Sequence, residues 1–224
     1  MKYDRLDDAG TIHIHYEGPS LDALALGILE VQLHRIAEKV AVATLVSDRR
    51  SMFDLLQHPS FLPPGAWRQL RKRWPKSFDP MLYYEFVPQY LADIEGYASD
   101  SPVVRLRSES IRSGSLYQDL AVYLASALSN SDVRAVLQGF GGNLLYAIIN
   151  SGLRGIEWVS ERTQLPSGER ETQSVPVVFD PFDVGPNLRE IAKELIANSN
   201  GEASTLKITH KVKDGQKEIV IHLK

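Results

Sequence analysis

The sequence contains no cysteine among its 224 residues. This absence excludes disulfide bonds, thiol nucleophiles, iron–sulfur clusters and zinc sites built from thiolates. A dominant charge is lacking too, because 25 Lys and Arg stand against 28 Asp and Glu, for a net charge of −3. A chain whose whole surface served nucleic acid would be strongly basic, so any such contact has to be local.

We expect neither a targeting signal nor a membrane segment. The first ten residues are highly charged and contain no apolar run before a cleavage site, so we expect a cytoplasmic protein. The longest uncharged stretch, residues 135–153, includes Gln138, Asn143 and Asn150, whose amides would need partners inside lipid. We therefore expect no membrane span there, but a helix that is buried or faces a partner.

Catalytic and metal-binding signatures are absent from the sequence. It has no HExxH motif and no GxSxG elbow, and Gly139–Asn143 (GFGGN) fits neither a Walker loop nor a dinucleotide fingerprint. His13 and His15 lie on one face of an expected strand and could supply two metal ligands, but no HExxH motif, nearby carboxylate pair or cysteine supports such a site. We therefore predict no metal, no cofactor and no catalytic residue, and an enzyme is the less favoured reading.

The patterns that are present indicate an α+β fold. Residues 11–16 (TIHIHY) are β-branched and aromatic and end before Gly18, which is typical of a strand. From 21 to 46, apolar residues recur every three or four positions in two stripes, which predicts a long helix covered on most sides. Ser20 stands where an N-cap belongs.

The second half of the chain contains one ambiguous segment. Residues 103–108 alternate as a strand does, whereas 116–124 fit either a helix or a strand. Two tyrosines and a preceding glycine turn favour a strand that pairs with 103–108. The other expected elements are short helices and loops over 48–97, a helix at 131–150 distorted near Gly139–Gly142, a strand at 175–179 and a helix at 186–197.

The C-terminus carries the clearest local signal. Asp214-Gly215 separates two strand-like runs, which predicts a hairpin of 205–213 and 216–224. A two-residue turn would place Leu206 opposite Leu223 and Lys213 opposite Gln216. One face is then apolar apart from His210, which we expect to be a hydrogen-bonded core residue, and the other face is charged.

A polar stretch at 160–174 suggests a division of the chain. The first part, 1–160, would be dominated by helices 21–46 and 132–150. The second, 175–224, would be a strand–helix–hairpin unit, compatible with packing on the same core.

One short segment concentrates positive charge. Residues 67–76 (WRQLRKRWPK) contain five cations and no acid, namely Arg68, Arg71, Lys72, Arg73 and Lys76. Helical spacing puts Trp67, Leu70 and Trp74 on one face, so a docked helix with solvated cations is the simplest interpretation. Phosphates of a nucleic acid or nucleotide are an alternative, as are an acidic partner or a membrane surface.

Three pieces of the chain resemble uncharacterised bacterial and prophage-associated proteins. They are Tyr16–Ser20 (YEGPS) before the long helix, Ser113–Leu116 (SGSL) before a β segment, and Gly152–Trp158 (GLRGIEW) after the uncharged helix. The resemblance spans about residues 12–160. It implies a bacterial setting and no activity that can be carried over to a residue.

The leading functional hypothesis is a non-catalytic interaction or scaffold protein that self-associates. Its basis is the surplus of apolar helical surface, which a second copy of the chain would cover. The residues expected at that contact are Leu33, Ile36, Leu145, Ile148 and Ile149. The alternatives are a module that binds nucleic acid or another anion through 67–76, and a hydrolase of a phosphate-containing substrate bound near Arg71 and Arg73.

A homo-oligomer is therefore the expected state, and a different protein partner is compatible with the same surfaces. Nucleic acid ranks below both, and a membrane is the least expected partner. The sequence does not predict the biological process.

Overall fold

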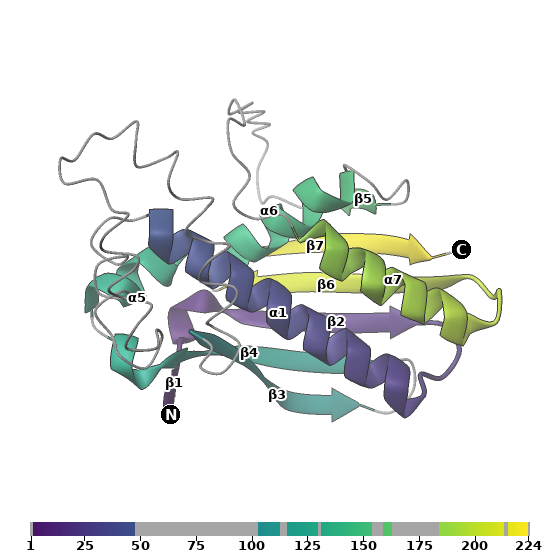
Figure 1. Ribbon diagram of the computed structural model, residues 1–224, viewed down its shortest axis with the longest axis horizontal. Helices are drawn as coiled ribbons and strands as arrows, with labels where there is room; N and C mark the ends of the chain where they lie inside the picture. Colours follow the sequence, from purple (N-terminus) through teal and green to yellow (C-terminus); the bar gives the residue numbers. More distant parts are fainter. Residues whose placement is uncertain are drawn as a thin grey trace, which may run out of the picture.

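The computed structural model of the chain is an antiparallel sheet with helices against one face (Figure 1). It describes residues 2–47, 103–112, 116–129, 131–153, 159–162, 184–212 and 215–223. The expected α+β class is confirmed, together with the long N-terminal helix and the C-terminal helix followed by a hairpin.

Within the described residues, seven strands form the sheet. They are β1 (Tyr3–Arg5), β2 (Thr11–Glu17), β3 (Val104–Arg112), β4 (Tyr117–Ala125), β5 (Val159–Arg162), β6 (Ser204–Val212) and β7 (Gly215–Leu223). From one edge to the other the order is β3, β4, then β1 and β2, then β6, β7 and β5. β1 and β2 lie end to end along one side of β4, separated by the short 3-10 helix η1 (Asp7–Ala9).

The ambiguous segment 116–124 forms strand β4 and pairs with β3, as the sequence favoured. Its alternation explains the outcome, because Leu120, Val122 and Leu124 are buried against the helices. The intervening residues, among them Asp119 and Tyr123, point to the opposite face. A bulge between Ser108 and Ser110 shifts the register of β3 against β4.

The helices described are α1 (Ala23–Ser47), α5 (Ser131–Leu137), α6 (Phe140–Leu153) and α7 (Gly185–Ser199), with a short 3-10 helix, η3 (Ser126–Leu128). α1 and α7 lie side by side across the sheet, and α6 contacts both (Figure 1). Asp22, not the expected Ser20, caps α1, because its Oδ1 accepts a hydrogen bond from the Ala25 N–H at 2.7 Å.

The core fills the space between the helices and the sheet. Ile12, Ile14 and Tyr16 of β2 are at most 2 % exposed there, and they pack with apolar residues of α1, α6 and α7. Residues from both sides of the polar stretch 160–174 belong to this one core, and β2 pairs directly with β6.

The hairpin forms, but its predicted register is wrong by two residues. Leu206 lies opposite Ile221, not Leu223, and Val212 lies opposite Gly215. The predicted faces are nevertheless correct, because side chains repeat with a period of two and a shift of two keeps each one on its face. The hydrophobic pattern therefore selected the face, whereas the choice between equivalent registers rested on the turn alone.

The glycine-rich segment interrupts the helix expected at 131–150. α5 ends at Leu137 and α6 begins at Phe140, in agreement with the expected distortion. Within α6, an added Cβ at Gly141 would lie 2.0 Å from Nε2 of His210. His210 is 6 % exposed and its Nε2–H donates to the Ala9 carbonyl at 2.6 Å, which confirms the expected hydrogen-bonded core histidine.

Several expectations fall outside the described residues. They concern the segments 48–97 and 175–179 and the basic segment 67–76 with Arg68, Arg71, Lys72, Arg73 and Lys76. Among the helices that the structure describes, none combines the length and the apolar character needed to cross a bilayer.

Candidate functional site on the open face of the sheet

The face of the sheet opposite the helices carries polar, aromatic and cationic side chains. Within the described part of the chain no helix packs against it, and we call it the open face. Its side chains alternate with core side chains along each strand. Those used below are Arg5, His13, His15, Arg105, Arg107, Ser110, Arg112, Tyr117, Asp119, Tyr123, Lys207 and Thr209.

A row of polar side chains crosses the middle of the open face. Strand pairing aligns Ser110 of β3, Asp119 of β4, His13 of β2 and Thr209 of β6. Nδ1 of His13 lies 2.6 Å from Oδ1 of Asp119, and the Ser110 hydroxyl donates to the other carboxylate oxygen. Asp119 is therefore held from both sides.

These contacts keep Asp119 charged. Hydrogen bonds from Ser110 and then His13 lower the pKa of Asp119, and Arg112, 3.7 Å from Oδ2, acts in the same direction. The order of the groups also matters for chemistry. The serine donates to the carboxylate rather than to the imidazole, so the row lacks the Ser–His pair of a histidine-activated nucleophile.

Two arginines of the edge strand β3 lie over tyrosine rings. The guanidinium carbon of Arg105 is 4.6 Å from the ring centroid of Tyr3, and that of Arg107 is 4.4 Å from the ring centroid of Tyr123. Both distances fall within the range of a cation–π contact. The rings thus hold two exposed guanidinium groups on the open face.

The cations of the open face differ in whether a carboxylate neutralises them. Arg5 bonds Glu109, and Lys207 lies 2.9 Å from Glu17. Among the described residues, no ion pair joins Arg105 or Arg107 to a carboxylate. These two guanidinium groups therefore retain N–H donors that a bound anion could use.

A stacked pair of rings lies at the other end of β4. The rings of His15 and Tyr117 are 3.8 Å apart with an interplanar angle of 16°. Burial lowers the pKa of His15, which disfavours the charged form of its imidazole. Tyr117 keeps 43 % of its surface exposed, so one aromatic face is open to a ligand.

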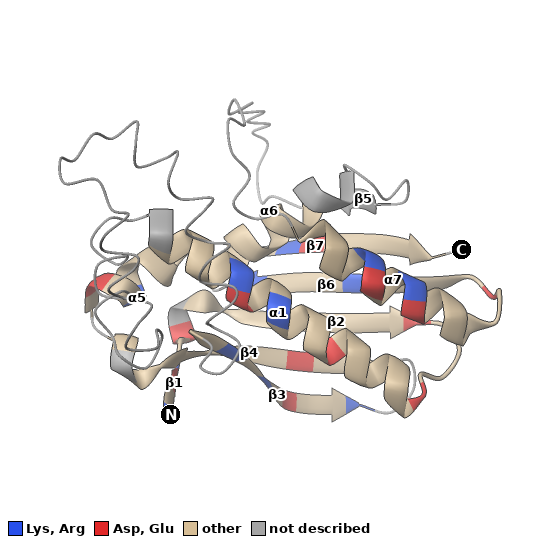
Figure 2. Ribbon diagram, viewed as in Figure 1, with Lys and Arg blue, Asp and Glu red and all other residues tan. Residues whose placement is uncertain are grey.

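The helix side of the molecule has a different charge pattern. Cationic and acidic residues lie together on α7 and on the middle of α1 (Figure 2). Opposite charges so close together largely cancel at a distance. The stacked arginines of β3 are therefore the more selective feature for an anion.

The apolar residues expected at a self-association contact lie inside the chain's own core. Leu33, Ile36, Leu145 and Ile148 are at most 3 % exposed, and Ile149 packs partly buried against the same core. These side chains are covered within the chain itself, whereas Leu24 and Val31 of α1 stay 64 % and 49 % exposed. Self-association through another surface stays a prediction.

His13 and His15 share a face of the first strand, as expected from their spacing. Asp119 joins His13, but among the described residues no group of three or more potential ligands could hold a metal ion. The basic segment and the hydrolase reading that depends on Arg71 and Arg73 fall outside the described residues, so both stay predictions.

The sequence interpretation missed Asp119, Arg105 and Arg107. The alternation of 103–108 already implied that the two arginines share a face. Nothing local indicated Asp119, which lies 106 residues from His13 in the chain. Comparison with protein-family models, curated proteins and solved structures found no match for this chain.

Proposed function

We propose that the protein is a non-catalytic interaction module whose open face binds an anionic partner. The observation that carries the proposal is the pair Arg105 and Arg107, each held on a tyrosine ring and neither in an ion pair with a described carboxylate. This replaces the buried apolar helices as the basis for an interaction role.

The chemistry of arginine supports this reading. A guanidinium presents several N–H donors in a rigid plane that matches carboxylate and phosphate oxygens, and it is only weakly hydrated. Contact with a tyrosine ring restricts each guanidinium group and so reduces the entropy lost on binding. Two such groups two residues apart on one strand lie about 7 Å from each other, a spacing that suits a ligand with repeated anionic groups.

We expect replacement of Arg105 and Arg107 by glutamine to weaken binding of inorganic polyphosphate at least tenfold. A hydrogen bond to a charged group contributes about 1.5–3 kcal/mol, and about 1.4 kcal/mol corresponds to a factor of ten in affinity. The measurement is isothermal titration at low salt, because salt screens exposed charges. Both residues are exposed, so the melting temperature of the variant should differ little from that of the wild type.

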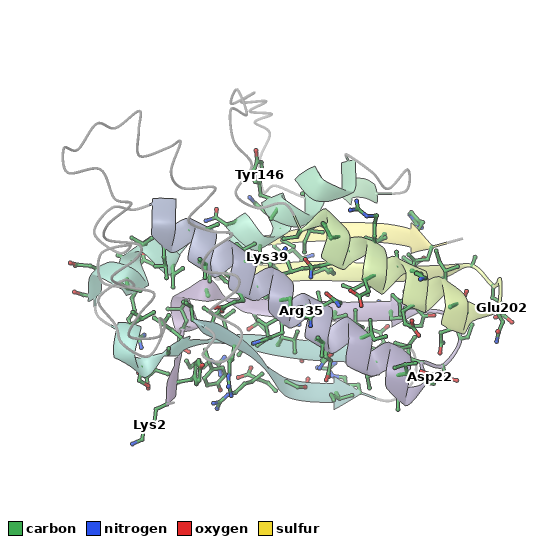
Figure 3. The ribbon with its side chains drawn as sticks, viewed as in Figure 1. Lys2, Asp22, Arg35, Lys39, Tyr146 and Glu202 are labelled. Atoms are coloured by element: carbon green, nitrogen blue, oxygen red, sulfur yellow. The ribbon has the colours of Figure 1, made fainter. Side chains whose placement is uncertain are left out.

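The matched control is Arg35→Gln. Arg35 is exposed on α1, on the helix side of the molecule (Figure 3). The Arg35→Gln replacement removes one positive charge and leaves the open face unchanged. An equal loss per charge removed would show that only net charge matters and would contradict the open face as the site.

The basic segment provides the second comparison. If Arg71, Lys72 and Arg73→Gln abolishes binding while the Arg105 and Arg107 variant retains it, the anion site belongs to that segment. A wild-type protein that binds no polyanion at low salt would overturn the proposal altogether.

Self-association is tested separately, by native mass measurement with and without nuclease. A strictly monomeric mass at micromolar concentration would remove that hypothesis. Such a result would leave the anion-binding proposal intact.

A further inference from the structure

We infer that the anionic partner of the open face is single-stranded nucleic acid. The inference rests on the proposed function and names the chemical class of its ligand. Three features of the open face lead to it: a fixed carboxylate among the cations, flat π surfaces, and the shape of an uncovered sheet.

The first feature is the Asp119 carboxylate in the middle of the face. It is ionised and lies on the same face as the stacked arginines. A uniform polyanion such as polyphosphate would be repelled at this position. A nucleic acid instead offers base amino groups, which donate hydrogen bonds to a carboxylate, alongside phosphates that pair with arginine.

The second feature is the supply of planar groups. The exposed face of Tyr117 and the guanidinium planes of Arg105 and Arg107 are surfaces on which bases stack. Tyr117 and Tyr123 are six residues apart on one strand and therefore about 20 Å apart. That length accommodates several nucleotides of an extended strand.

The third feature is the shape of the site. Bases in a duplex are stacked inside the helix, whereas a single strand can turn its bases onto a protein surface. The described strands offer a broad sheet face rather than a projecting helix that would enter a groove. The geometry therefore favours a single strand over a duplex.

The net charge of −3 makes long-range attraction of nucleic acid unfavourable. Binding has to come from the local contacts named above, so we expect micromolar affinity at low salt. The affinity should fall with salt with a logarithmic slope of about −0.7 per phosphate neutralised. The Arg105 and Arg107→Gln variant should flatten that slope by about 1.4.

The experiment measures fluorescence anisotropy with labelled single-stranded 12-mers of RNA and DNA, with an abasic strand of the same length, and with polyphosphate as competitor. RNA and DNA are both included because base faces and phosphates are common to the two. The base-bearing strands should bind at least tenfold more tightly than the abasic strand, since stacking contributes about 1–3 kcal/mol per base.

The diagnostic variant is Tyr117→Leu, and its matched control is Tyr146→Leu. The two tyrosines are similarly exposed, at 43 % and 48 %. Tyr146 lies on α6, on the helix side and away from the open face (Figure 3). We expect Tyr117→Leu to weaken binding of base-bearing strands about tenfold and to leave polyphosphate binding unchanged. Tyr146→Leu should change neither.

The outcomes separate this inference from the proposed function. If the abasic strand and polyphosphate bind as tightly as the base-bearing strands, nucleic acid is not the ligand, although anion binding stands. Equal losses in Tyr117→Leu and Tyr146→Leu would also overturn the inference. If no probe binds, the inference and the proposed function both fail.

Discussion

Replacing Gly141 by alanine is expected to destabilise the protein by about 3 kcal/mol. The new Cβ would lie 2.0 Å from Nε2 of His210, far inside van der Waals contact. The imidazole would have to move, and its buried hydrogen bond to the Ala9 carbonyl would be lost. Overpacking of a core costs about 1–3 kcal/mol and an unpaired buried polar group a similar amount. Urea unfolding at constant pH measures the difference in unfolding free energy between the variant and the wild type.

Gly142→Ala is the control one residue along the same helix. Nothing lies within 4 Å of a Cβ at that position, so alanine should stabilise α6 by up to about 1 kcal/mol through helix propensity. Equal effects at Gly141 and Gly142 would contradict the close contact between α6 and β6.

A double variant tests the contact with His210 directly. His210→Ala alone should destabilise the protein, because it leaves a cavity and an unpaired carbonyl. Combined with Gly141→Ala, it removes the clash, so the double variant should lose less stability than the sum of the two single variants. If the losses of unfolding free energy were strictly additive, a side chain at position 141 would not contact His210.

Unfolding free energy should fall by up to ~3 kcal/mol between pH 4.5 and pH 8 because of one buried carboxyl, Glu38. Burial raises the pKa of Glu38 from 4.5 to about 7, although it accepts hydrogen bonds from Val103 N–H at 2.7 Å and Val104 N–H at 3.0 Å. The folded protein therefore holds this proton more tightly than the unfolded chain. The stabilisation is complete below pH 4.5 and is lost as pH rises through 7.

Glu38→Gln isolates this contribution, because glutamine cannot ionise. The difference in unfolding free energy between wild type and variant should change by ~3 kcal/mol from pH 4.5 to 8, in favour of the variant at high pH. Taking the difference cancels most effects of other groups, such as Asp119 and His210, whose pKa values are lowered. The neighbouring side chains of His34 and Arg105 are present in both proteins, so their effects cancel in the difference as well.

The control for Glu38 is Glu30→Gln on the same helix. Glu30 is exposed and accepts a hydrogen bond from Gln118. Its replacement controls for the general effect of a Glu→Gln change on α1. A wild-type minus Glu38→Gln difference that is flat with pH would contradict a desolvated carboxyl at the start of β3.

Glu38 also explains how the edge of the sheet is protected. On edge strand β3, the outward N–H groups of Val104 and Leu106 donate hydrogen bonds to Glu38 and His34 of α1, respectively. They are therefore not left unpaired. An unpaired edge would invite pairing with another chain. Only the tertiary structure reveals this role, because the partners are more than 60 residues apart in sequence.

The sequence by itself determined the elements with strong local patterns. The two apolar stripes of 21–46 required a covered helix, and the tyrosines and glycine turn near 116–124 favoured the strand that forms β4. The faces of the C-terminal hairpin were likewise fixed by a period of two, and the glycines at 139–142 predicted the break between α5 and α6. Each of these rests on neighbours along the chain.

Only the tertiary structure decided what those elements meet. It covered Leu33 and Ile148 with the chain's own core, because a hydrophobic stripe specifies burial but not the surface that buries it. The hairpin register, one of two with identical faces, is likewise seen only in the folded chain. The tertiary structure also brought Asp119 to His13 across the pairing of β2 with β4. Contacts between residues so distant in sequence leave no periodic signal, which is why the open face emerges only from the folded chain.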